Sequence, residues 1–208
     1  MLNKILDLLF PENLVCHLCG NEAVVNERGI CSGCEKEVRV CPELPLIPHV
    51  DGISAGLIYD ELTGPCLHRF KYNNGKYLTS FFISYMKVPD KKIDVIVPVP
   101  LHKNRQRQRG YNQSELLAKK IAERENIRFD PHIIARTRDT GTQTKLSHKQ
   151  REKNVKGAFS VLSNVKGLDI VLIDDVITTG STLSECAKVL KKAGAGKVYA
   201  LCACARGN

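Results

Sequence analysis

Two adjacent acidic residues followed by a loop of glycine and hydroxyl residues form the most informative stretch of this sequence. Asp174 and Asp175 come where the apolar, β-branched run Ile170–Ile173 is expected to end as a buried strand. Thr178–Thr182 then begin a stretch that is expected to be helical through Leu190. Amides and hydroxyls at a helix start bind anions, whereas paired carboxylates suit hydroxyl groups or a metal ion. The stretch therefore predicts a ligand with a phosphate beside a diol, as in ribose 5-phosphate.

A purely structural interpretation competes with this prediction, because paired acids at a strand end and small residues at a helix start are both common in α/β proteins. The combination is more specific than either half. Residues Ile170–Thr182 resemble the 13-residue signature of the type I phosphoribosyltransferases, which bind phosphoribosyl pyrophosphate (PRPP). The resemblance implies that PRPP binds at Asp174, Asp175, Thr178, Thr179, Gly180, Ser181 and Thr182.

Four of the nine cysteines form two Cys-x-x-Cys pairs, Cys16 with Cys19 and Cys31 with Cys34. Eleven residues separate the two pairs, which is a spacing typical of a tetrahedral zinc site. Four protein ligands leave no open position for water, so the zinc is expected to be structural.

The odd number of cysteines and their paired spacing indicate metal ligands in a reducing cytoplasm rather than a disulfide framework. Cys41 is an alternative ligand, and His17, inside the first pair, is expected to be exposed rather than coordinating. The remaining cysteines are expected to be small core residues, and they are Cys66, Cys186, Cys202 and Cys204.

The positive charge of the chain lies in one window. The whole chain has 31 Lys and Arg against 22 Asp and Glu, and residues 102–156 alone hold 15 against 6, which accounts for the entire net charge of +9. Such a window attracts a diphosphate substrate or a nucleic acid, although a solvated basic surface is the alternative. Four cations alternate with amide side chains and, in an extended run, would face a single-stranded DNA; they are Lys103, Arg105, Arg107 and Arg109.

The 208 residues fit an α/β domain with a small N-terminal appendage. We expect an N-terminal helix, a zinc finger and a proline-rich linker within residues 1–48, and a parallel sheet flanked by helices within residues 49–208. Strands are expected near residues 53–59, 93–97, 133–137, 169–173 and 197–204. Residues 61–85 are expected to be partly helical, and residues 139–154 to form a mobile loop. No segment approaches the ~20 apolar residues of a membrane span, and the apolar N-terminus does not read as a signal peptide.

The chain as a whole resembles the ComF competence proteins, which join a short zinc finger to a phosphoribosyltransferase-like domain and are related to the amidophosphoribosyltransferases. The two cysteine pairs carry this resemblance together with PVPLHKNRQRQRGYNQSELLA, ARTRDTGTQTKLSHKQREKNVKGAF and IVLIDDVITTGSTL. It implies a pyrophosphate loop at Val97–Lys103, including Val99, Pro100, Leu101, His102 and Lys103, and a flexible catalytic loop at Arg138–Arg151. Catalytic roles are thereby implied for Asp175, Arg138, Lys145 and Arg151, with Mg²⁺ on the pyrophosphate.

The resemblance implies a role in natural transformation, in the handling of incoming single-stranded DNA in the cytoplasm. Two interpretations stay open. The protein is a phosphoribosyltransferase whose acceptor is not specified, or it is a PRPP-binding adaptor or regulator for a DNA-uptake helicase or for nucleotide metabolism. Any hood over the acceptor is expected from residues 51–88, which contain no acid–amide cluster suited to one nucleobase. The sequence indicates no oligomeric state.

Overall fold

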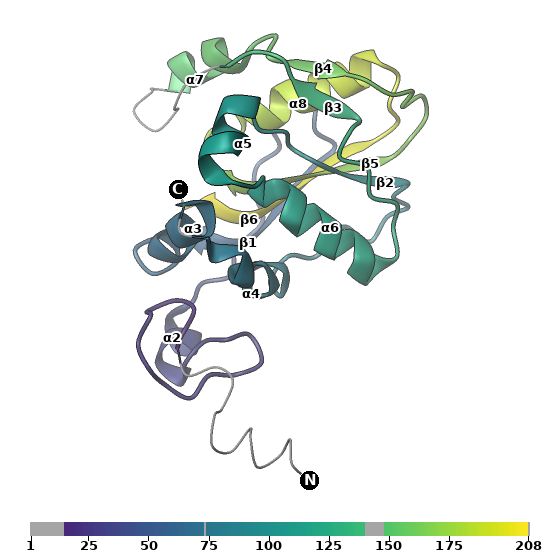
Figure 1. Cartoon of the computed structure of the whole chain (residues 1–208). Helices are drawn as coiled ribbons and strands as arrows, with labels where there is room; N and C mark the ends of the chain where they lie inside the picture. Colours follow the sequence, from purple (N-terminus) through teal and green to yellow (C-terminus); the bar gives the residue numbers. More distant parts are fainter. Residues whose placement is uncertain (1–14, 73, 140–147, 208) are drawn as a thin grey trace, which may run out of the picture.

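The computed structural model in Figure 1 describes residues 15–72, 74–139 and 148–207, without the side chains at 148, 149, 151 and 152. The predicted helix at residues 2–10 lies outside these ranges. The division of the chain near residue 48 stays a prediction.

A four-stranded parallel sheet forms the centre of the molecule, as the sequence predicts (Figure 1). In spatial order its strands are β1 (Gly52–Tyr59), β6 (Val198–Arg206), β5 (Ile170–Ile177) and β2 (Val95–Pro98). The side chains of β5 alternate between two hydrophobic cores. Val171 and Ile173 belong to one core, and Ile170 and Leu172 belong to the other, so a continuous apolar run satisfies both faces.

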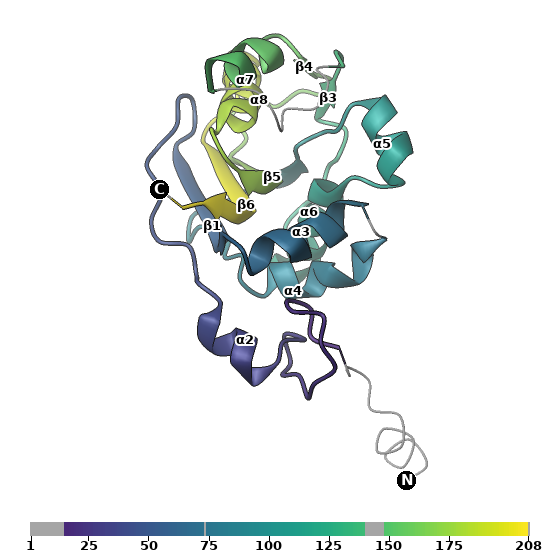
Figure 2. The ribbon, with the colours of Figure 1, turned by 90° about the vertical axis from the view of Figure 1, so that its left-hand side faces the viewer.

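Helices cover both faces of the sheet (Figure 2). One face is covered by α3 (Thr63–Tyr72), the 3₁₀ helix η1 (Gly75–Leu78), α4 (Thr79–Ile83) and α6 (Gln113–Glu125). The other face is covered by α8 (Ser181–Lys192), against which α7 (His148–Val155) packs. None of the described helices is both long and apolar enough to cross a membrane.

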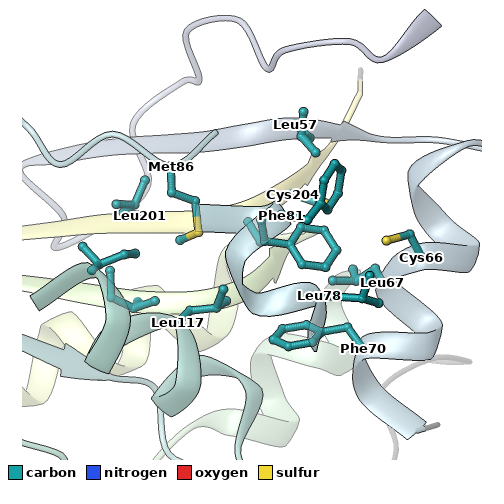
Figure 3. Close-up of a cluster of buried hydrophobic side chains, with 14 of the residues drawn as sticks. Leu57, Cys66, Leu67, Phe70, Leu78, Phe81, Met86, Leu117, Leu201 and Cys204 are labelled. Carbon is teal, nitrogen blue, oxygen red and sulfur yellow. The ribbon is translucent and has the colours of Figure 1, made fainter. Parts of the chain in front are cut away.

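Aliphatic, sulfur-containing and aromatic side chains together fill the core on the α3 side of the sheet (Figure 3). The ring centroid of Phe82 lies 5.2 Å from that of Phe70 and 5.1 Å from that of Phe81. These three rings are buried, so they form the apolar faces of helices and are not available to stack nucleic-acid bases. The four cysteines predicted as core residues are all fully buried, and they are Cys66, Cys186, Cys202 and Cys204.

The cysteine-rich lobe packs beneath α3 and α4 (Figure 1). Its buried residues Cys16, Leu18 and Ile30 join the same hydrophobic core as Phe70 and Phe81. Helix α2 (Ser32–Glu37) begins after Cys31, whose Sγ accepts a hydrogen bond from the backbone N–H of Cys34. The lobe therefore shares its interior with the helices above it.

The segment predicted as a linker is attached to the sheet. Val40 forms an antiparallel bridge with Leu57 of β1, and the N–H of Cys41 donates to the carbonyl of Gly56 at 3.0 Å. Further along, Ile47 packs against the core on the α8 side. This segment thus lies along the edge strand of the sheet.

Three elements differ from the expectation. β5 continues to Ile177, through both acids, instead of ending before them. Strand β3 (Ile134–Arg136) pairs antiparallel with β4 (Phe159–Val161) in a separate two-stranded sheet. Helix α7 occupies part of the segment expected to be an irregular loop, because a polar helix has no apolar period to reveal it.

Candidate functional site

A cavity of about 540 Å³ opens where β5 separates from β2. The ladder between these strands ends at the pair Pro98 and Ile173, and the N–H of Val99 makes the last bond to the carbonyl of Ile173 at 2.9 Å. The ladder between β5 and β6 continues to Ile177. Asp174 and Asp175 therefore stand on a strand that is supported on one edge and open on the other. Ten predicted ligand-binding residues line the cavity, namely Asp174, Asp175, Thr178, Thr179, Gly180, Ser181, Thr182, Val99, Pro100 and Leu101.

The carboxylate of Asp174 is held by two hydrogen bonds. Its Oδ1 accepts from the N–H of Asp175 at 2.8 Å and from Oγ of Ser114 at 2.9 Å. Burial of the carboxyl and repulsion by Asp175 nevertheless raise the pKa of Asp174 to about 7. The carboxyl groups of Asp174 and Asp175 therefore repel each other, and a bound cation would reduce this repulsion.

Asp175 has a cationic partner that the sequence analysis did not identify. The ammonium group of Lys71, on α3, lies 2.9 Å from Oδ1 of Asp175, and both side chains are mostly buried. A lysine surrounded by aromatic residues at sequence positions 69–82 gives no signal that it points toward acids a hundred residues away.

The backbone conformation of the loop Thr178–Thr182 depends on one glycine. Gly180 is the N-cap of α8 and has φ of 72°, in the left-handed region. A Cβ there would lie 2.9 Å from Cγ2 of Ile47, so the position also lacks room for a side chain. Oγ1 of Thr179 lies 2.8 Å from Oγ of Ser181 and accepts from the N–H of Ser181 at 3.4 Å, whereas the N-cap Gly180 has no side chain to cap the first turn of α8. The start of α8 therefore offers amides and hydroxyls to an anion in the cavity.

The alternating cations form a helix rather than an extended run. Lys103–Arg109 are α5, whose N-cap His102 accepts at Nδ1 from the N–H of Asn104 at 3.4 Å. Residues two apart on a helix lie on different sides, so the four cations cannot face one strand as predicted. Arg105 and Arg109, four apart, line the cavity, whereas Lys103 and Arg107 line a separate shallow hollow on the outer side.

A third arginine in the cavity comes from β3. Arg136 is only 9% exposed, and its guanidinium lies 5.4 Å from the ring centroid of Phe159. Burial, together with repulsion by Arg105, lowers the pKa of Arg136, and burial with repulsion by Arg109 lowers that of Arg105. Arginine stays charged under such conditions, so an anion placed among these groups would be strongly favoured. No motif in the sequence marks Arg136.

Three polar residues at the start of α6 connect the parts of the site. Asn112, the N-cap, donates to the carbonyl of Val99 at 3.1 Å. Gln113 is fully buried; its Oε1 accepts from Arg109 at 3.0 Å and its Nε2 donates to the carbonyl of Lys71 at 3.2 Å. Ser114 is the partner of Asp174 described above. The sequence signal that could have identified this junction is Asn112, a residue type favoured at the N-cap, directly before the helical pattern.

Other predicted site residues lie away from the cavity. Arg138 donates to the carbonyls of Asn154 and Lys156 at 2.9 and 2.7 Å, so it caps the end of α7. Lys145 and the side chain of Arg151 lie outside the described residues. His102 and Lys103 are on α5 but are not among the residues that line the cavity, and Nδ1 of His102 lies 3.2 Å from Oδ2 of Asp139.

The four predicted zinc ligands come together. The Sγ atoms of Cys16, Cys19, Cys31 and Cys34 all lie within 4.8 Å of one another, and those of Cys19 and Cys31 are 4.0 Å apart. Tetrahedral thiolate zinc with bonds of ~2.3 Å requires sulfur atoms about 3.8 Å apart, so the cluster fits the ion. Cys41 is not part of this cluster.

His17, between the first pair of ligands, differs from the expectation of an exposed residue. It is half-buried, with its ring centroid 5.5 Å from that of Tyr77 and 6.2 Å from that of Phe81. It is not part of the cysteine cluster, as expected.

The model of the phosphoribosyl transferase domain family matches residues 108–208, which include the whole of β5 and α8. Curated bacterial proteins match over most of the chain. Competence protein F of Haemophilus influenzae is 32% identical, over 89% of this chain and 94% of its own. DNA utilization protein YhgH of Escherichia coli K12 is 30% identical, over 91% and 96% respectively, and competence protein ComFC of Bacillus subtilis is 30% identical, over 86% and 72%. The chain belongs to the ComF family of competence proteins.

Solved structures give a more distant likeness. The chain is 20% identical to the glutamine PRPP amidotransferase of B. subtilis, with a TM-score of 0.44, and the match covers 66% of this chain. It spans 30% of that enzyme. A phosphoribosylpyrophosphate synthetase from Mycobacterium smegmatis gives a TM-score of 0.33 at 17% identity, over 73% of this chain and 41% of its own.

The raised pKa of Asp174 predicts a dependence of stability on pH. The folded protein keeps a proton on the Asp174 carboxyl, whereas the unfolded chain releases it near pH 4. The contribution of this carboxyl to the free energy of unfolding is therefore fully present below about pH 4 and is lost as the pH rises through about 7. Without Mg²⁺, the free energy of unfolding of Asp174→Asn, taken relative to that of wild type, should therefore increase from pH 5 to pH 8 by an amount on the order of 1–4 kcal/mol. Urea denaturation at both pH values measures this, with the exposed Asp90→Asn as control. An equal difference at both pH values would contradict the assignment.

The cysteine cluster predicts about one bound zinc per chain. Cys16→Ser should lose the metal and lower the melting temperature, because the ligands also pack in the shared core. Elemental analysis and thermal melts measure both effects. Cys41→Ser is the matched control and should retain the metal. A well-folded native preparation without metal would overturn the assignment.

Proposed function

We propose that this protein binds PRPP with Mg²⁺ in the cytoplasm, in the handling of single-stranded DNA during natural transformation. One observation carries the proposal: a single cavity brings together an acid pair, a helix start whose amides and hydroxyls could bind an anion, and four arginines, which are Arg105, Arg109, Arg136 and Arg206. PRPP needs all three, because it carries a ribose diol, a 5-phosphate and a pyrophosphate. The relatives named for competence and for DNA utilization support the setting.

Each part of the ligand has a matching group in the cavity. The 5-phosphate is assigned to Thr178–Thr182 at the start of α8. The ribose hydroxyls are assigned to Asp174 and Asp175, which would also hold Mg²⁺ and so bring positive charge next to the pyrophosphate. The pyrophosphate is assigned to the turn Val99–Leu101 and to Arg105. Among the described residues, the buried Nη2 of Arg105 has no hydrogen-bond partner, as expected of a donor that awaits an anion.

Phosphoribosyl transfer is the reaction that this proposed complex supports. Positive charge near the departing pyrophosphate stabilises the transition state, and Arg105 and Arg136 are placed to supply it. Asp175 is the proposed acid–base group, and the segment Arg138–Arg151, which includes Lys145, is the proposed closing loop. The alternative is an adaptor that binds PRPP without consuming it, for a DNA-uptake helicase or for nucleotide metabolism. Release of pyrophosphate when free bases or single-stranded DNA are offered separates the two.

The PRPP assignment predicts the effect of removing both acids. Asp174→Ala with Asp175→Ala should weaken PRPP binding in the presence of Mg²⁺ by at least about tenfold, since each lost charge-assisted contact is worth roughly 1.5–3 kcal/mol. Isothermal titration calorimetry measures the affinity, and circular dichroism checks the fold. Asp90→Ala, at an exposed site, should bind as wild type does. An unchanged affinity in the folded double variant would refute the assignment.

We also propose that the outer side of α5 binds single-stranded DNA without sequence preference. The helix turns Lys103 and Arg107 away from the cavity, next to Gln106 and Gly110 in the shallow hollow. This division leaves Arg105 and Arg109 for the phosphates of PRPP. Of the four cations predicted to bind DNA, only Lys103 and Arg107 are therefore proposed to bind it.

The division of α5 predicts separable effects on DNA and PRPP. Lys103→Glu with Arg107→Glu should weaken DNA binding and reduce the slope of log affinity against log salt by about 1.4, at ~0.7 per phosphate contact. The same variant should keep the PRPP affinity of wild type. The matched variant Arg105→Glu with Arg109→Glu should instead lose PRPP binding. Fluorescence anisotropy with a labelled single-stranded oligonucleotide measures the DNA affinity at several salt concentrations. A slope equal to that of wild type would refute the assignment.

A further inference from the structure

Helix α3 lies between the cysteine cluster and the acid pair and contacts both. Arg69 points to the cysteine lobe and Lys71 points to the cavity. Residues two apart on a helix are separated by about 200°, so the two cations occupy opposite sides of α3. The helix is therefore placed to transmit a change from one site to the other.

Arg69 fixes the helix to the metal-binding turn. Its Nη2 donates to the carbonyl of His17, and to the carbonyl of Leu18 at 3.1 Å. These two carbonyls lie between the ligands Cys16 and Cys19. The position of α3 is thus tied to the backbone that the metal would hold.

The end of α3 is fixed on its other side by the polar start of α6. Tyr111 donates its hydroxyl to the carbonyl of Phe70, and Gln113 donates to the carbonyl of Lys71. These bonds hold the backbone at Lys71, so the ammonium group is carried on a flexible four-carbon stem from a fixed backbone position. Only the ammonium group has to move for the ion pair with Asp175 to open.

We propose that Lys71 is an internal competitor for the acid pair, which the ligand must displace, and that Arg69 holds α3 in the position from which Lys71 reaches Asp175. The competition follows from the position of the ammonium group, which lies 2.9 Å from the carboxylate oxygen that the proposed function assigns to Mg²⁺ and the ribose hydroxyls. This inference rests on that proposed function. Among the residues that the structure describes, the other titratable groups that interact with the acid pair are Arg136 on β3 and the thiols of Cys186, Cys202 and Cys204.

The first test compares PRPP binding, with Mg²⁺ in excess, by wild type and Lys71→Met. Methionine keeps the apolar stem and removes the charge. If Lys71 competes, the variant should bind PRPP roughly three- to tenfold more tightly. Lys119→Met, at an exposed position of α6, is the control for the loss of one positive charge and should not bind more tightly. Equal or weaker binding by Lys71→Met overturns the competition, and weaker binding makes Lys71 a contact of the ligand instead.

A second measurement needs no ligand and keeps failure of this inference distinct from failure of PRPP binding. Removing Lys71 leaves the mostly buried carboxylate of Asp175 without its cationic partner, so the folded state should become less stable. The melting temperature of Lys71→Met should fall below that of wild type, and the fall should be much smaller when Asp175→Asn is already present. If this difference is seen but no variant binds PRPP, the ion pair stands, whereas the proposed function and the competition both fall. If it is absent, the ion pair is not formed in solution.

The connection to the cysteine lobe is tested with Arg69→Met. The variant should keep its zinc and gain part of the affinity that Lys71→Met gains, because a less firmly held α3 weakens the ion pair. In the double variant, Arg69→Met should add nothing to Lys71→Met, since the competitor is already gone. Additive effects, or no effect of Arg69→Met alone, overturn the connection. Arg69→Lys, which keeps a donor, replaces the methionine variant if the latter does not fold.

Discussion

The repulsion between two neighbouring carboxylates is the interaction on which the rest of this site depends. Asp174 and Asp175 are adjacent on a central strand and line the same cavity, and Asp175 is buried. The surrounding structure compensates with a hydroxyl from α6, a backbone amide and the ammonium of Lys71. The compensation is incomplete, because burial of Asp174 and the remaining repulsion from Asp175 still raise the pKa of Asp174 to about 7. A protein retains such a site when a cation or a diol completes it, which is the physical basis of the proposed ligand.

The cavity exists because neighbouring strands of a parallel sheet separate where their connections leave in different directions. β2 turns away at Pro98, while β5 stays paired with β6 for four further residues, to Ile177. The opened edge exposes the acids, and α5 and β3 then place arginines opposite them. The cavity thus brings the acid pair and its partner Lys71 together with several arginines, which suits a ligand that carries hydroxyls and metal at one end and phosphates at the other.

The cysteine lobe belongs to this arrangement because it shares a core with the helices that bound the cavity. Leu18 and Ile30 of the lobe pack with Phe70 of α3 and Phe81 of α4. A cluster of four thiols in so small a lobe suggests that the metal supplies the stability that its own core cannot. The lobe then supports α3 from below, and α3 carries both the wall of the cavity and the cation that faces Asp175.

The sequence alone determined the elements whose residues are informative by themselves. The apolar run of β5, the acid pair, the loop at α8 and the cysteine spacing each follow a local rule, and the structure brings the acids and the loop to one cavity and the four cysteines into one cluster, although β5 continues through the acids. The tertiary structure decided the features that depend on the direction in which side chains point and on partners that are far apart in the sequence. The cations at residues 103–109 alternate along the chain, but a helix sends them to two sides. Lys71 and Arg136 have no distinguishing neighbours in sequence, and their roles arise only because folding brings α3 and β3 to β5. Spacing along the chain specifies local geometry, whereas electrostatic pairing depends on distances that only the packed fold sets.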